Sequence, residues 1–389
     1  MTSLAILFIG LSQTLFALVV ILSRRDRRVH DLVLAAALAT IAFKFLIHLM
    51  HAQHPRFFDI DFSLGLVPLT FGPFIYLYAR YITSELRRFR VADLLHFLPF
   101  AVLTIVYFAA LKDEVDFRDT RYLALNAGLA ARLIYAAIFF TSIVAYTGLT
   151  LRLLHRYRLL LVDFFSFRTA DNRLLWVNAL VILYAATFGL YFVAGGLNAA
   201  YQREFIDLGL LSHAGLTLLA FVTSYFGVKQ PSLFSEPDQA IPVDAEAPAS
   251  DEESGPARSL DDDVVETYRA RLLDFMETER PHLEPELTLG RLSDRVNIPK
   301  HDLSLLLNRY IGKNFFQFVN EYRVQEVVRR MGDARFDHLT LQAIAYDSGF
   351  KSKSTFNAFF KQATGATPSA YKEELLRSKA SQGTDDQDD

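Results

Sequence analysis

The chain contains no cysteine among its 389 residues, one tryptophan and four methionines. The absence of cysteine excludes a disulfide-stapled extracellular domain, a thiolate metal site and a cysteine nucleophile. Charge is also scarce, at 21% of residues, whereas 52% are hydrophobic and 34 are phenylalanine. Because this balance is more apolar than that of an ordinary soluble chain, the composition indicates a membrane protein.

Seven apolar stretches, each about as long as a bilayer is thick, occupy the first 230 residues. Their limits are approximately residues 3–22, 31–50, 64–83, 94–111, 127–150, 174–197 and 207–228. Alternate loops differ in Lys and Arg: the loops at 24–28, 80–90 and 152–173 contain 13, and the other loops contain five. The positive-inside rule therefore predicts that the N-terminus lies outside and the C-terminus in the cytoplasm.

Four basic or titratable side chains fall inside these stretches, toward the predicted outer leaflet: Lys44, His48, Arg132 and His213. No Asp or Glu occurs at comparable depth, and unpaired charge in a membrane is costly. One hypothesis is a ligand pocket whose cations receive a small anionic ligand or a lipid headgroup. The alternative is that Lys44 and Arg132 reach the interface or pair with Asp59 and Asp61 of the first outer loop.

A change of composition divides the chain. Residues 231–263 contain ten acidic residues, five prolines and one arginine, which predicts a disordered linker. We therefore expect a transmembrane sensor domain over 1–230, a folded domain over 264–380 and an acidic disordered tail over 381–389.

The predicted folded domain contains one motif twice, with a spacing of 52 to 53 residues. Thr288 and Thr340 are expected to cap helices, and Asn297 and Gly349 suit turns that need positive φ. Ser293 and its counterpart, Ala345, are small, as helices that cross closely require. Each copy is therefore predicted to be a helix-turn-helix, with a helix over about 314–331 joining the two and a helix over 264–279 preceding them.

The second copy, GFKSKSTFNAFFKQATGATPSAY, resembles the C-terminal signature of the AraC/XylS family of bacterial transcription regulators. The segment LSLLLNRYIGKNFFQFVNEYRV is similar to the family's first recognition helix and linking helix. The resemblance covers about residues 285–372 and is closest to a branch with a membrane-embedded N-terminal half. It implies an AraC-type double helix-turn-helix domain, whereas the polytopic seven-helix transmembrane bundle before it rests on hydropathy alone. Together they predict an all-α protein.

The resemblance also implies a function. The expected protein is a membrane-bound, one-component transcription regulator in the bacterial inner (cytoplasmic) membrane, which surrounds it with a lipid bilayer. Its C-terminal domain would bind double-stranded DNA sequence-specifically, as a homodimer, under the control of a signal sensed in the membrane half.

Carried over by position, the family's base-contacting residues would be His301, Ser304, Leu305, Asn308, Lys353, Ser354, Asn357 and Ala358. Nearby cations are expected to contact DNA phosphates: Lys300, Arg309, Lys313, Lys351 and Lys361. Many family members have arginine where this chain has Leu305 and Ala358, so both helices lack a strong guanine-reading side chain, and Asp302 adds an acidic group. This departure leaves an alternative, a membrane receptor or transport-associated protein whose C-terminal module binds a protein partner.

Motifs for catalysis are missing from the sequence. It contains no Gly-rich phosphate loop, no kinase-type nucleotide motif and no metal cluster with ligand spacing; His51 and His54 form a pair without further ligands. We therefore expect no enzyme activity, no metal and no cofactor.

Overall fold

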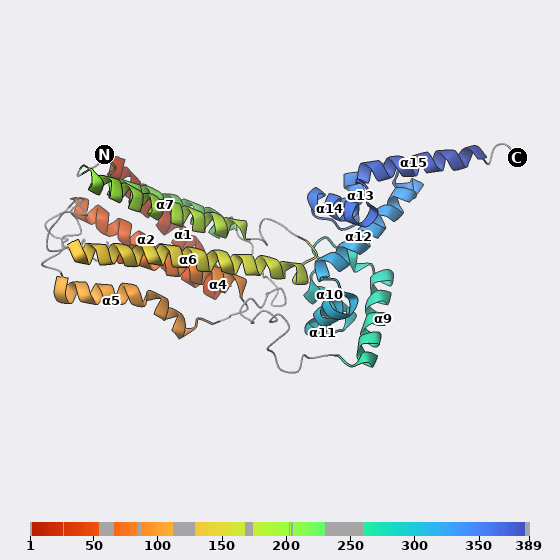
Figure 1. Cartoon of the computed structure of the whole chain (residues 1–389), viewed down its shortest axis with the longest axis horizontal. Coiled ribbons are helices and arrows are strands. Elements are labelled where there is room, and N and C mark those ends of the chain that lie inside the picture. The colour runs from red at the N-terminus through yellow and green to blue at the C-terminus, as the bar shows by residue number, and fades with distance from the viewer. Residues whose placement is uncertain are drawn as a thin grey trace. The chain divides into compact units, whose positions relative to one another are not determined.

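The computed structural model describes residues 2–25, 27–53, 66–84, 88–111, 129–167, 174–201, 203, 205–229 and 260–385. Over these residues the fold is all-α, as predicted, and it forms two compact units (Figure 1). The first unit consists of the described residues up to 156 and those from 174 to 229. The second unit consists of 157–167 and 260–385. Residues 231–259 of the predicted linker lie outside the described residues. Its last two residues, 262 and 263, are expected to be disordered but begin a helix.

The first unit is built from apolar helices, which satisfy their backbone hydrogen bonds internally, as a bilayer requires. They are α1 (Thr2–Leu22), α2 (Val29–Gln53), α4 (Phe71–Thr83), α5 (Leu98–Val106), most of α6 (Leu129–Phe164), α7 (Leu175–Ala200) and α8 (Leu208–Lys229). The 3-10 segment Val91–Phe97 precedes α5, and the π-helical turn Tyr107–Leu111 follows it. Prolines lie at the starts of these pieces: Pro68 begins a 3-10 turn before α4, and Pro99 lies in the first turn of α5.

Six helices of the described residues are long and apolar enough to cross a membrane. They correspond to all of the predicted stretches except the third, where α4 has only 13 residues. The membrane character is therefore confirmed, and the count of seven spans stays a prediction.

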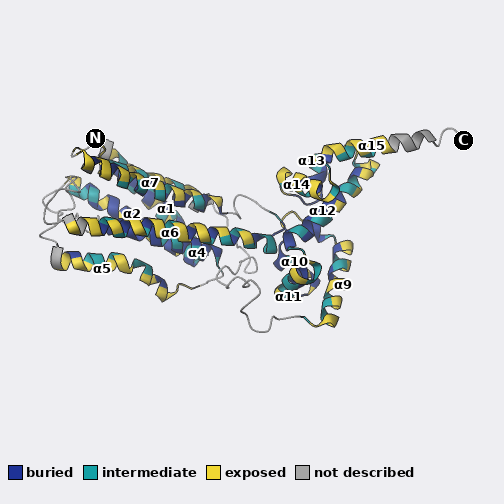
Figure 2. Ribbon diagram, in the orientation of Figure 1, coloured by how far each residue is buried: buried dark blue, intermediate teal, exposed yellow. Residues whose placement is uncertain are grey.

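The surface of the first unit is apolar as well as its interior. Among the described residues, every exposed large hydrophobic side chain lies in this unit or on α6, except Tyr346 and Leu376. Exposed positions run along the lengths of α5, α6 and α7 (Figure 2). Exposed apolar side chains on this scale indicate a lipid-facing surface. Inside, α1 packs on α2 and α8, and α7 packs on α8. Glycines permit close approach: Gly10 faces Phe45, and Gly215 faces Thr187.

Seven α-helices of the described residues lie wholly within the second unit. They are α9 (Asp262–Thr278), α10 (Leu289–Val296), α11 (Lys300–Leu305) with the π-helical turn Leu306–Ile311, α12 (Phe315–Gly332), α13 (Leu341–Asp347), α14 (Lys353–Thr364) and α15 (Pro368–Asp385). α15 continues past residue 380, where a disordered tail is expected, because most of 372–382 are good helix formers and none is Gly or Pro.

Local side chains fix the ends of these helices. The Thr288 hydroxyl accepts from the Arg291 amide and the Thr340 hydroxyl from the Ala343 amide, at 3.3 and 3.1 Å. Asn297 has φ 53° and Gly349 has φ 93°. Both predicted helix-turn-helix units are therefore present with the predicted caps and turn residues.

α12 joins two separate apolar cores. Its first half supplies Phe315, Phe318 and Val319 to the core of the first helix-turn-helix unit. Its second half supplies Val327 and Met331 to the core of the second. The two helix-turn-helix units are thus packed on one rigid helix.

Candidate nucleic-acid interface

α14 presents the second set of predicted DNA-contacting residues on one face. Its exposed residues include Lys353, Ser354, Asn357, Ala358 and Lys361, which repeat at helical spacing. The opposite face is anchored by Phe356 and Phe360, which are buried in the core. The packing therefore directs the predicted contact residues outward as a group.

α11 and the turn after it present the first set less openly. His301, Asn308 and Arg309 are exposed, whereas Ser304 and Leu305 are half-buried. The Asn308 side-chain amide donates to the Ser304 hydroxyl at 3.4 Å. Asn308 also hydrogen-bonds the side chain of Asp163. Part of this recognition helix is therefore already engaged by the protein itself.

Some of the predicted phosphate-contacting cations also contact other side chains of the protein. Lys313 forms an ion pair with Glu321, and Lys351 forms one with Glu286. Lys300 lies over the ring of Phe164, with its Nζ 5.1 Å from the ring centroid. The remaining two, Arg309 and Lys361, are exposed.

Arg323 of α12 is a central residue of the second unit that the sequence analysis missed. It is 1% exposed, and its guanidinium donates to the carbonyls of His282 and Glu284 at 2.8 and 2.7 Å. Its Nη1 donates to the Ser166 carbonyl at 2.8 Å, and its Nη2 to the Ser166 hydroxyl at 3.0 Å. Burial lowers the pKa of Arg323 to about 9, so the guanidinium stays charged at neutral pH. Helical spacing could have revealed it, because Arg323 is four residues from both Val319 and Val327, which are buried.

Glu326, one turn further on, is the second missed residue. Its carboxylate is buried and accepts hydrogen bonds from Arg329 at 2.8 Å and Arg330 at 2.6 Å, and it pairs with Arg280. Burial alone would raise the pKa of Glu326, but these arginines lower it to about 2. The cluster ties α12 to the segment that follows α9.

In the first unit, three of the four predicted ligand-pocket residues lie together. Lys44 is 6% exposed, and the rings of His48 and His213 meet edge to face with centroids 4.5 Å apart. The His48 Nδ1 lies 2.9 Å from the Lys44 carbonyl, and the His213 Nδ1 is buried without a hydrogen-bond partner among the described residues. The side chain of Arg132, and Asp59 and Asp61, fall outside what the structure describes.

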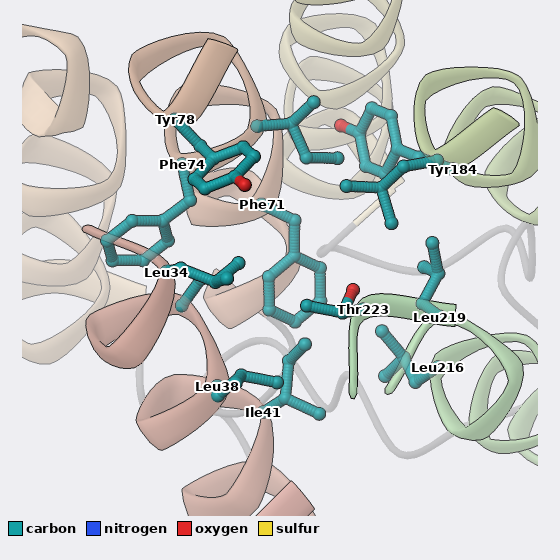
Figure 3. Close-up of a pocket in the computed structure, with 13 residues that line it drawn as sticks. Leu34, Leu38, Ile41, Phe71, Phe74, Tyr78, Tyr184, Leu216, Leu219 and Thr223 are labelled. Carbon is teal, nitrogen blue, oxygen red and sulfur yellow. The ribbon is translucent and has the colours of Figure 1, made fainter. Parts of the chain in front are cut away.

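A small apolar cavity of about 40 Å³ lies further along the same two helices, α2 and α8, where they approach α4 and α7. Leu38, Phe71 and Leu216 point into it, and the hydroxyls of Tyr184 and Thr223 lie at its edge (Figure 3). The Tyr184 hydroxyl has no hydrogen-bond partner among the described residues. The region between α2 and α8 is therefore apolar at the cavity and carries a basic side chain, Lys44, further along.

Comparison with known proteins places the C-terminal region in a family. A family model described as a helix-turn-helix domain matches residues 292–374, which confirms the predicted AraC-type domain. An uncharacterized HTH-type transcriptional regulator of Staphylococcus aureus (strain COL) is 29% identical over 113 residues. This match covers 29% of the chain and 14% of the relative. No solved structure matches significantly.

Proposed function

We propose that this chain is a membrane-bound, one-component transcription regulator. Its AraC-type domain binds double-stranded DNA in a sequence-specific manner from the cytoplasmic face of a bacterial inner membrane, as a homodimer on repeated half-sites. A signal received by the membrane half controls that binding.

The observation that carries this proposal is that the two recognition helices pack against the same helix, α12. α12 contributes to both cores, and α14 directs Asn357 and two lysines outward on one face. Two helices held on one body can read adjacent stretches of one DNA face. Asn357 suits adenine, and Lys353 suits guanine or a phosphate.

The test is selection of bound DNA from a random pool by the full-length protein in lipid nanodiscs, at two salt concentrations. We expect a recovered motif with two boxes about one helical turn apart, and affinity that falls steeply with salt because several phosphates are contacted. Absence of binding at both salts contradicts the proposal and favours the protein-partner alternative, which Leu305 and Ala358 keep open.

We further propose that Lys44, His48 and His213 receive the signal as an anion. A buried ammonium beside two imidazoles has no carboxylate within ion-pair distance among the described residues, so an anionic group would supply the missing charge. Free phosphate and an acidic lipid headgroup share this chemistry.

Hydrogen exchange in α2 and α8 distinguishes the two sources. Protein in phosphatidylcholine nanodiscs is measured with and without inorganic phosphate, and protein in nanodiscs that contain phosphatidylglycerol is measured without phosphate. Protection in one arm that is lost in Lys44→Met identifies the source. Equal exchange in all arms for wild type and Lys44→Met contradicts an anion site.

A further inference from the structure

The last two residues of α6 and the three residues after it form a short segment that belongs to the second unit. We call residues Asp163–Phe167 the strap. Phe165 forms an antiparallel bridge with Thr288, the cap of α10. The Ser166 amide and hydroxyl both donate to the Leu287 carbonyl, at 3.3 and 2.6 Å. Phe165 and Ser166 are buried in this contact.

α12 also binds the strap. Arg323 donates to both the carbonyl and the hydroxyl of Ser166, and the Asn320 side chain donates to the same carbonyl at 3.1 Å. Arg323 and Asn320 are both almost fully buried. A buried guanidinium is costly unless its donors are used, so the strap supplies acceptors that α12 needs.

The strap also contacts residues that the proposed function assigns to DNA. Asp163 hydrogen-bonds Asn308, a predicted base reader. Phe164 lies under Lys300, and Phe167 lies under Lys351, whose Nζ is 4.7 Å from the ring centroid. Three of the predicted DNA-contacting side chains, one polar and two cationic, are thus directed at the strap.

We propose that the strap is an autoinhibitory element whose docking competes with DNA; this rests on the proposed function. A phosphate that approached Lys300 or Lys351 would have to draw each ammonium from its aromatic ring. A base edge at Asn308 would have to displace a carboxylate, which itself repels DNA. The bound strap and bound DNA therefore exclude one another at these contacts.

The covalent connection of the strap provides the control. α6 is a single helix of 36 residues that begins in the first unit and ends at Phe164, inside the strap. A rotation or sliding of α6 in response to the signal withdraws the strap from Arg323 and frees the three side chains. Helix shifts of this kind are a common switching motion.

An engineered disulfide tests the competition. The natural chain contains no cysteine, so within one molecule two introduced cysteines can pair only with each other. Phe167 and Glu286 are each two residues from the antiparallel bridge at Phe165 and Thr288, and both contact Lys351. The full-length double variant Phe167→Cys/Glu286→Cys is purified in nanodiscs, and DNA binding is measured oxidised and after reduction. Phe167→Cys/Asp337→Cys, whose second site lies beyond α12, is the matched control.

We expect the first pair to crosslink and its oxidised form to bind DNA on the order of tenfold more weakly than its reduced form, since the Asp163–Asn308 hydrogen bond and the Lys300–Phe164 cation–π contact, which Phe167→Cys leaves in place, are held closed. Asp163→Ala should bind DNA more tightly than wild type. Failure to crosslink overturns the docking. Crosslinking with equal or stronger DNA binding overturns the inhibition. If neither wild type nor reduced protein binds DNA, the proposed function fails, and the competition with it.

Discussion

Gly349 lies where the two helices of the second helix-turn-helix unit turn, with φ 93° and an added Cβ placed 2.3 Å from the His282 carbonyl oxygen. Gly365 has a similar φ of 77° but open space around it. We expect Gly349→Ala to destabilise the second unit by about 3 kcal/mol or more, because strain and a backbone clash add. Gly365→Ala should cost only about 1 kcal/mol. Hydrogen exchange of the α13 and α14 amides in the full-length protein measures both, and equal losses would contradict the clash.

Glu326 makes the stability of the second unit sensitive to acid. Its pKa in the fold is about 2, below its ordinary value of 4.5, so its contribution is complete above pH 4.5 and is lost as the pH falls toward 2. The contribution is at most about 3 kcal/mol. Glu326→Gln should lower the protection of α12 amides at pH 7 and flatten its dependence on pH between 4.5 and 2. An unchanged pH profile of amide protection would argue against the role of this charge.

α14 is proposed to make two kinds of DNA contact, one to a base and one to a phosphate, and substitutions on this helix should distinguish them. Asn357→Ala should remove preference at one base position, at a cost of about 1–3 kcal/mol for the preferred site. Lys361→Ala should weaken binding to every sequence alike and reduce the salt slope by about 1, because it removes one phosphate contact. Binding to the selected motif and to scrambled DNA, each over a salt series, distinguishes them.

The contact between α7 and α8 depends on Gly215, where an added Cβ would lie 2.1 Å from a methyl carbon of Thr187. The Thr187 side chain is short and branched, so it cannot turn away easily. Gly215→Val should therefore lower the thermal stability of the first unit, whereas Gly189→Val on α7, which has open space, should not. Tryptophan fluorescence reports this unit, since the single tryptophan, Trp176, lies on α7.

At the scale of the whole molecule, the proposed orientation assigns the loops to opposite sides of the membrane. Tyr201, between α7 and α8, is 67% exposed and is proposed to lie outside. Arg88, before α5, is exposed and is proposed to lie in the cytoplasm. In intact cells an impermeant maleimide should label Tyr201→Cys and should label Arg88→Cys only after permeabilisation. The reverse pattern would contradict the orientation.

The sequence by itself determined the features that depend on local chemistry. Apolar stretches of membrane length, N-capping threonines and the positive-φ residues Asn297 and Gly349 act over a few residues, so their pattern is legible without a fold. The two helix-turn-helix units and the outward face of α14 follow from that pattern, because inward and outward positions alternate with the helical period.

Only the tertiary structure decided which distant residues meet. Ser166 is 157 residues from Arg323, and the contact between them forms because a buried guanidinium needs hydrogen-bond acceptors, a requirement that no local sequence pattern displays. Lys44 and His213 likewise come together only because α2 and α8 pack side by side. Long-range polar contacts are set by how whole elements dock. The strap could therefore be identified only in the fold, whereas the recognition helices could be predicted from the sequence.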